Sequence, residues 1–81
     1  MVESVFSPRY VRMRRLLVDA RKSQRVSQAV LAEKLGRAQT FVSKYERGER
    51  RLDVVEFLDV AEALNLDPIK LVRQIQSTGA K

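Results

Sequence analysis

Apolar residues recur along this chain at spacings of three and four positions, which places them on one face of a helix. Five stretches follow this pattern, and they cover residues 8–23, 28–35, 39–47, 53–65 and 68–76. No stretch has the alternation of apolar and polar residues that is typical of a strand. The predicted fold class is therefore all-α, with five helices.

Polar side chains stand where most of these helices need a cap at their start. The hydroxyls of Ser7 and Ser27 can each accept a hydrogen bond from an unpaired amide of the first turn. Asp53 and Glu56 form a capping box, with aspartate in the place of serine or threonine. The third helix is the exception, because Ala38 offers no side-chain oxygen. We expect its start to be less firmly fixed, by ~1 kcal/mol.

The helix over 53–65 is expected to form the far wall of the core. Asn65 tolerates a left-handed backbone and can end this helix. The apolar residues at helical spacing, which we expect to point inward, are Val54, Phe57, Leu58, Ala61 and Leu64.

A very short turn joins the helices over 28–35 and 39–47. Gly36 ends the first helix and Gly48 follows the second, and glycine adopts the left-handed backbone of a helix end at almost no cost. Two helices with so short a connection must cross steeply, and Ala32 is small enough for the contact between them. This arrangement is a helix-turn-helix.

A chain of 81 residues corresponds to a single small domain. We expect its core over residues 8–76, an N-terminal arm over 1–6 and a tail over 77–81. The absence of cysteine excludes disulfides and is consistent with a reducing cytoplasm. No apolar run approaches the ~20 residues of a membrane span, so no membrane contact is predicted. We expect no signal peptide in residues 1–6, which contain an acid and lack a basic start.

The charge is positive and unevenly distributed. Sixteen Lys and Arg stand against ten Asp and Glu, for a net charge of +6. Basic residues dominate 34–51, whereas residues 52–67 contain acids and no base. On net charge alone a well-solvated surface explains the excess equally well. The separation into a basic and an acidic side favours a polyanion as the partner of the basic side.

Catalysis is poorly supported. The chain has no histidine and no cysteine, which removes the commonest general base, the strongest nucleophile and the usual transition-metal ligands. Glu56 and Asp59 lie one helical turn apart, and on an acidic helix such a pair is usually solvated surface. No glycine belongs to a phosphate-binding loop pattern. We predict that the chain is not an enzyme and holds no metal and no cofactor.

Three segments carry a resemblance to a known family: Ser27-Gln28, residues 31–36 (Leu-Ala-Glu-Lys-Leu-Gly) and residues 42–48 (Val-Ser-Lys-Tyr-Glu-Arg-Gly). They resemble the Cro/repressor-type helix-turn-helix of the XRE family, and the resemblance extends from about residue 9 to residue 72. It implies a repressor-like DNA-binding domain in which the second helix of the motif enters the major groove.

The resemblance also implies roles for individual residues. Base-reading positions fall on Gln39, Thr40, Ser43 and Lys44. Contacts to the DNA backbone are expected from Gln28, Arg37, Arg47, Arg50 and Arg51. For each of these residues ordinary surface solubility is the alternative. Phe41 either packs at the edge of the core or meets the DNA, and the core edge is slightly favoured.

Two further expectations concern contacts within and between chains. Members of the family often pair an arginine of the first helix with the glutamate that ends the third, which predicts an internal ion pair between Arg21 and Glu46. Apolar residues in and before the last helix exceed what one helix needs for a core. They are candidates for a dimer interface, although they can also all pack inward: Leu66, Ile69, Leu71, Val72 and Ile75.

The resemblance implies a sequence-specific regulator of transcription that binds double-stranded DNA. We expect a repressor that binds a palindromic operator as a homodimer, in the cytoplasm, as a nucleoid-associated protein of bacterial or phage origin. The alternative is a protein-interaction module, antitoxin-like or bridging, with mainly non-specific DNA affinity and a protein partner on its acidic side.

Overall fold

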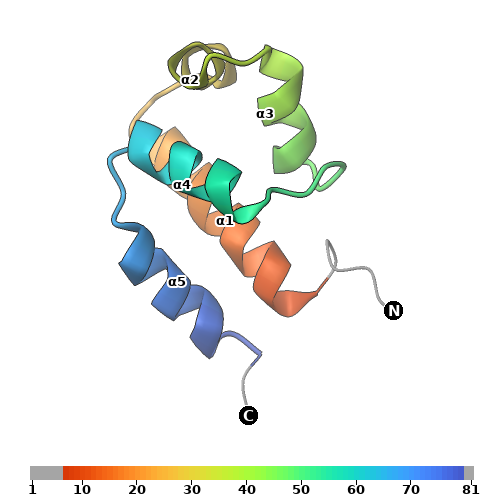
Figure 1. The fold of residues 1–81 in the computed structure, drawn as a ribbon, viewed down its shortest axis with the longest axis vertical. Coiled ribbons are helices and arrows are strands. Elements are labelled where there is room, and N and C mark those ends of the chain that lie inside the picture. The colour runs from red at the N-terminus through yellow and green to blue at the C-terminus, as the bar shows by residue number, and fades with distance from the viewer. Residues whose placement is uncertain (1–6, 80–81) are drawn as a thin grey trace.

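The computed structural model describes residues 7–79 and has five helices and no strand in that range (Figure 1). The all-α prediction is therefore confirmed, and each predicted helix lies within two residues of its observed bounds. The predicted arm over 1–6 and the last two residues of the predicted tail lie outside the described residues. The helices are α1 (Pro8–Ser23), α2 (Gln28–Leu35), α3 (Gln39–Glu46), α4 (Val54–Ala63) and α5 (Pro68–Ser77).

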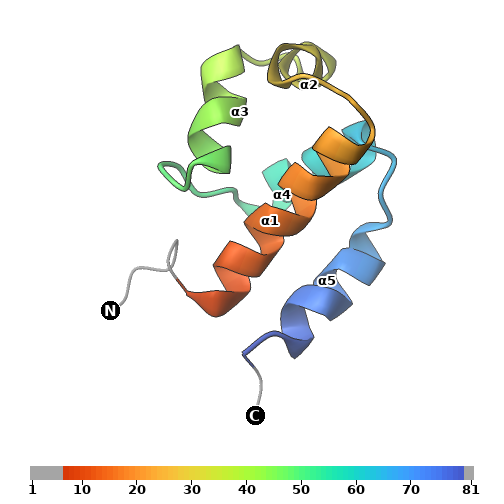
Figure 2. The same ribbon diagram turned by 180° about the vertical axis from the view of Figure 1, so that it is seen from behind.

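The helix-turn-helix, formed by α2 and α3, lies at one end of the molecule, and α5 lies at the other (Figure 1). Helix α1 links the two ends, because it packs against both α3 and α5. Seen from behind, α1 and α5 run side by side in opposite directions (Figure 2). Helix α4 packs on α2 and α5 and closes the core. No helix within residues 7–79 has the length and apolar character needed to cross a membrane.

The helix ends follow the local sequence. Ser7 and Ser27 accept the predicted capping bonds from the amides of Tyr10 and Val30, at 3.1 and 3.0 Å. Gly36 ends α2 with a φ of +68°, the left-handed conformation that favours glycine. Asn65 has a φ of +57° after α4, also as predicted.

The inner face of α4 differs from the prediction. Phe57, Ala61 and Leu64 are buried as expected, but Val54 is 74% exposed and Leu58 is also exposed. Val60, which the prediction left out, is fully buried. Two overlapping apolar stripes are present on this helix, and packing against α2 selects the stripe at 57, 60, 61 and 64. Val54, Val55 and Leu58 are left on the outside.

Candidate nucleic-acid interface

The outer face of α3 carries the residues predicted to read bases. Phe41, Val42 and Tyr45 are buried on its inner face. The predicted base-reading residues lie outside this buried set, with Ser43 half-buried and the others exposed: Gln39, Thr40, Ser43 and Lys44. As expected, Ala38 makes no side-chain capping bond at the start of α3. The helix is thus held by its inner face and presents polar side chains outward.

A buried carboxylate anchors the end of α3. Arg21 of α1 donates from Nε to Glu46 Oε2 at 2.6 Å and from Nη2 to Oε1 at 3.0 Å. The structure thus places the two residues of the predicted internal ion pair in direct contact, with both side chains buried. Arg21 also donates to the carbonyl of Val26, at 2.7 Å. The pair therefore joins α1, the start of α2 and the end of α3.

Gln28 takes part in the same network, which the sequence did not indicate. Its side-chain amide donates to Glu46 Oε1 at 2.8 Å. An amide nitrogen carries two hydrogens, so the second is still able to meet a phosphate. Gln28 was predicted to contact the DNA backbone. In the folded chain its side chain is already oriented by the hydrogen bond to Glu46.

Arg14 is a second contact to the end of α3 that the sequence prediction missed. Its Nη1 donates to the backbone carbonyl of Glu46 at 2.9 Å. Arg14 precedes Arg21 by two helical turns, so both arginines project from the same side of α1 toward α3. That heptad spacing was the available signal. Next to this contact Gly48 has a φ of +79°.

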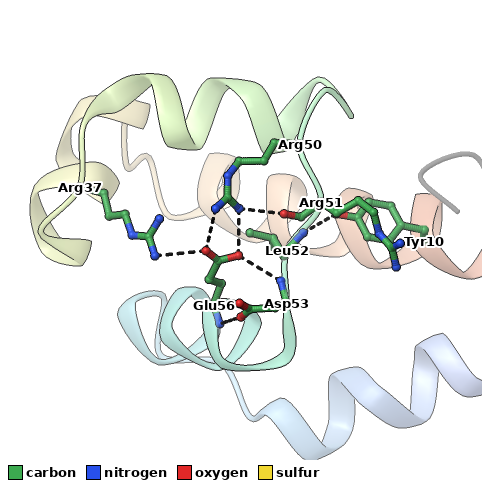
Figure 3. A network of polar contacts seen from close by, with 7 residues as sticks. All are labelled: Tyr10, Arg37, Arg50, Arg51, Leu52, Asp53 and Glu56. Atoms are coloured by element: carbon green, nitrogen blue, oxygen red, sulfur yellow. Dashed lines mark hydrogen bonds and ion pairs between the residues drawn. The ribbon is translucent and has the colours of Figure 1, made fainter. Parts of the chain in front are cut away.

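A second polar network centres on Glu56 at the start of α4 (Figure 3). Arg50 binds the carboxylate at two points, with both N–O distances 2.9 Å. Arg37 donates to Glu56 Oε2 at 3.1 Å, and the amide of Asp53 donates to Oε1 at 3.0 Å. The predicted capping box is confirmed, because Asp53 in turn accepts from the Glu56 amide at 2.7 Å.

The prediction that Glu56 is solvated surface is wrong. Its side chain is 10% exposed and lies between two guanidinium groups. The hydrogen bonds from Arg50 are the main reason that the pKa of Glu56 is lowered to about 2, against desolvation, which raises it. Glu56 is thus a fixed anion that holds two of the arginines predicted to contact the DNA backbone.

Phe41 is buried at the edge of the core, which is the position that the sequence analysis favoured over a contact with DNA. Its ring packs edge-on against Tyr45, with the ring centroids 5.5 Å apart. The guanidinium carbons of Arg37 and Arg50 lie 4.3 and 4.8 Å from the Phe41 centroid. Both distances are within the range of cation–π contact. The aromatic ring and the Glu56 carboxylate therefore restrain the same two arginines.

The other basic residues are less constrained. Arg47 is exposed and pairs with Glu49, with two N–O distances of 3.0 Å. This pair lowers the pKa of the Glu49 carboxyl through the hydrogen bond from Arg47. Arg51 is exposed and lies over the Tyr10 ring at 5.7 Å. Arg9 is turned away from α3, because it donates to the carbonyls at the end of α5, at 2.8 and 3.0 Å.

The predicted dimer residues divide into two groups. Leu71 is buried in the chain's own core, and Leu66 and Ile75 pack against it. For Leu71 the structure therefore has the second of the two alternatives, packing inward. Ile69 is 62% exposed and Val72 is also exposed on α5. Within residues 7–79 no three acidic, histidine or cysteine side chains gather at a distance suited to a metal ion.

Comparisons with known proteins agree with this architecture. A family model described as helix-turn-helix matches residues 17–71. An XRE-family like protein from Pseudomonas syringae pv. tomato is 43% identical over 85% of this chain and 84% of that one, with a TM-score of 0.82. The restriction-modification controller protein C.AhdI from Aeromonas hydrophila is 33% identical over 75% of this chain and 92% of its own, with a TM-score of 0.68. A point mutant of the restriction-modification controller C.Esp1396I has the same fold. It is 20% identical over 94% of this chain and 91% of its own, with a TM-score of 0.75. No curated protein sequence matches the chain.

Proposed function

Because the chain belongs to the XRE family of helix-turn-helix DNA-binding regulators, we propose that it represses transcription by binding a palindromic operator as a homodimer. The observation that carries this proposal is the outer face of α3. Gln39, Thr40 and Lys44 are exposed there, whereas Arg14 and Arg21 of α1 hold the end of the helix through Glu46. A rigidly held helix with an exposed polar face suits insertion into the major groove.

Base recognition is assigned to the first turns of α3. Gln39 has the two-point amide that pairs with the N6 and N7 edge of adenine. Lys44 reaches the O6 and N7 acceptors of guanine, and the Thr40 methyl contacts the methyl group of thymine. Ser43 lies beside them, with its hydroxyl directed to the Thr40 carbonyl at 3.3 Å. Ser43 is thus assigned a supporting contact.

Contacts to the phosphate backbone of the DNA are assigned to residues around the outer face of α3. Gln28 keeps one amide hydrogen for a phosphate, and Arg47 and Arg51 are exposed on either side of Gly48. Such contacts set the position and orientation of the protein without reading the sequence. Among the residues predicted to contact the DNA backbone, Arg50 is the least suited to bind a phosphate, because it already makes three hydrogen bonds within the chain.

The dimer is assigned to the outer side of α5. Ile69 and Val72 are large apolar side chains that the monomer leaves exposed. Pairing this surface with that of a second copy would bury both. Two recognition helices would then meet half-sites about 34 Å apart, one turn of DNA. We further assign the protein no catalytic role, and place it in the cytoplasm with the bacterial or phage DNA that it binds.

Selection of binding sites from randomised duplex DNA tests the proposal. We expect a palindromic site to be enriched, with affinity that falls with salt by about 0.9 log units per phosphate neutralised. Gln39→Ala and Lys44→Ala should each lose preference at one base position in each half-site, at a cost of about 1–3 kcal/mol per half-site. Lys70→Ala, on the far helix α5, removes the same charge as Lys44→Ala and should keep the preference. If no sequence is enriched, the protein-interaction module becomes the better hypothesis.

A further inference from the structure

Two different groups restrain the guanidinium of Arg37, and they are the same two that restrain Arg50. Arg37 Nη2 donates to Glu56 Oε2 at 3.1 Å, and Arg37 Cζ lies 4.3 Å from the centre of the Phe41 ring. The Phe41 ring is in turn buried and fixed by its edge contact with Tyr45. The guanidinium is therefore held against a rigid part of the core.

The same guanidinium keeps most of its hydrogen-bonding capacity. A guanidinium has five N–H donors, and Arg37 uses one of them within the described part of the chain. Its side chain is 41% exposed, and it immediately precedes the N-cap of α3. A restrained, exposed cation with free donors at the start of the recognition helix is suited to an incoming phosphate.

Arg50 has the complementary role in this arrangement (Figure 3). It occupies both oxygens of Glu56 and also donates to the Arg51 carbonyl at 2.8 Å. The charge of Glu56 is thus already balanced by Arg50. Two guanidinium groups against one carboxylate leave a net positive charge, and the more available donors belong to Arg37.

We propose that Phe41 and Glu56 are positioning residues that hold Arg37 ready to bind a DNA phosphate beside the recognition helix. This inference rests on the proposed function. Ordering a long side chain on binding costs affinity, and Arg37 is already ordered by folding. Phe41 thus contributes to DNA binding without touching the DNA.

A double-mutant cycle in the full chain tests this role, with dissociation constants for the selected duplex measured over a salt series. Arg37→Ala should weaken binding and lower the salt slope by about 1.8, the value for one phosphate contact from each protomer of the dimer. Phe41→Leu keeps an apolar core residue and removes the ring. It should weaken binding roughly 2–10-fold when Arg37 is present and have no effect in the Arg37→Ala background. Lys70→Ala removes a charge on α5, the helix assigned to the dimer, so its sedimentation is first matched to that of the wild type; its affinity and slope should then be unchanged.

A purely structural role for Phe41 would give a different pattern. Phe41→Leu would then weaken binding equally in both backgrounds, and that result would overturn the inference. Arg37→Lys keeps the charge and leaves the core intact, so it serves as a second test if Phe41→Leu does not fold. It should keep the salt slope but lose affinity several-fold, because an ammonium group lacks the planar stacking of a guanidinium. Full affinity in Arg37→Lys would also refute the inference.

The failure of the inference is distinguishable from the failure of the proposed function. A wild-type chain that binds no duplex above the non-specific level would refute the regulator itself, and the positioning role with it. Selective binding by the wild type, combined with independent losses in the cycle, would refute the positioning role alone.

Discussion

The guanidinium of Arg21 meets the carboxylate of Glu46 at two points, across 25 residues of sequence, and both side chains are buried. Removing one partner leaves the other as an uncompensated buried charge. We expect Arg21→Ala and Glu46→Ala each to lower the free energy of unfolding by ~3–5 kcal/mol. The double variant should lose clearly less than the sum of the two, because the stranded charge is then gone.

Urea unfolding followed by circular dichroism measures this cycle. Arg47→Ala is the matched control, because it breaks an exposed Arg–Glu pair and should cost at most about 1 kcal/mol. Additive losses for Arg21 and Glu46 would mean that the pair has no energetic coupling.

Gly48 lies against Arg14, and this contact distinguishes it from the other glycine of the helix-turn-helix. A β-carbon at Gly48 would stand 3.3 Å from Arg14 Cζ, whereas one at Gly36 would meet nothing within 4 Å. Both glycines have positive φ, so alanine at either position should cost about 1–2 kcal/mol through the left-handed backbone. Gly48→Ala should cost more than Gly36→Ala, because the Arg14 side chain must also shift by a few tenths of an ångström.

Thermal unfolding of the two glycine variants, with and without Arg14→Ala, isolates this contact. The difference between Gly48→Ala and Gly36→Ala should disappear once Arg14 is removed. A difference that persists would place its cause in the loop backbone.

Features that depend on residues within one helical turn were predictable from the sequence. The capping box of Asp53 and Glu56 spans three positions, and the caps at Ser7 and Ser27 span the same distance. Each needs only a side-chain oxygen at the right offset from an unpaired amide. The helix bounds, and with them the outer face of α3, were therefore accessible without the structure.

Features that depend on how the helices pack were not predictable in the same way. Arg14 meets the Glu46 carbonyl across 32 residues, and Arg37 meets Glu56 across 19. The choice between Val54 and Val60 on α4 is similar, because both lie on stripes with helical spacing. Only the direction from which α2 packs decides between them. The Arg21–Glu46 pair was expected because of the family resemblance, which supplied the long-range information.

Removal of one or the other of two buried tyrosine hydroxyls should not have the same effect on the stability of the fold. The Tyr45 hydroxyl has no hydrogen-bond partner among residues 7–79, and burial raises the pKa of this group. The Tyr10 hydroxyl accepts a hydrogen bond from the buried amide of Leu52 at 2.8 Å. Tyr45→Phe should therefore leave stability unchanged or raise it by up to about 1 kcal/mol, whereas Tyr10→Phe should lower it by about 1–3 kcal/mol.

Unfolding midpoints and slopes in urea measure both tyrosine variants under the same conditions. A loss of stability in Tyr45→Phe as large as that in Tyr10→Phe would show that the Tyr45 hydroxyl is stabilising.

Glu56 should make the stability of the fold depend on acid pH. Its pKa is about 2 in the folded chain, held down mainly by the hydrogen bonds from Arg50, against an ordinary value of 4.5. A folded-state pKa below the unfolded value means that the stabilisation is fully present above pH 4.5. This stabilisation is lost as the pH falls from 4.5 toward 2.

The side chain of Glu56→Gln cannot ionise, so this variant should be less stable than the wild type at pH 7 and should lose less stability on acidification. The measurement is urea unfolding of both proteins between pH 7 and pH 2. Parallel profiles would show that the Glu56 carboxylate does not contribute to the acid sensitivity.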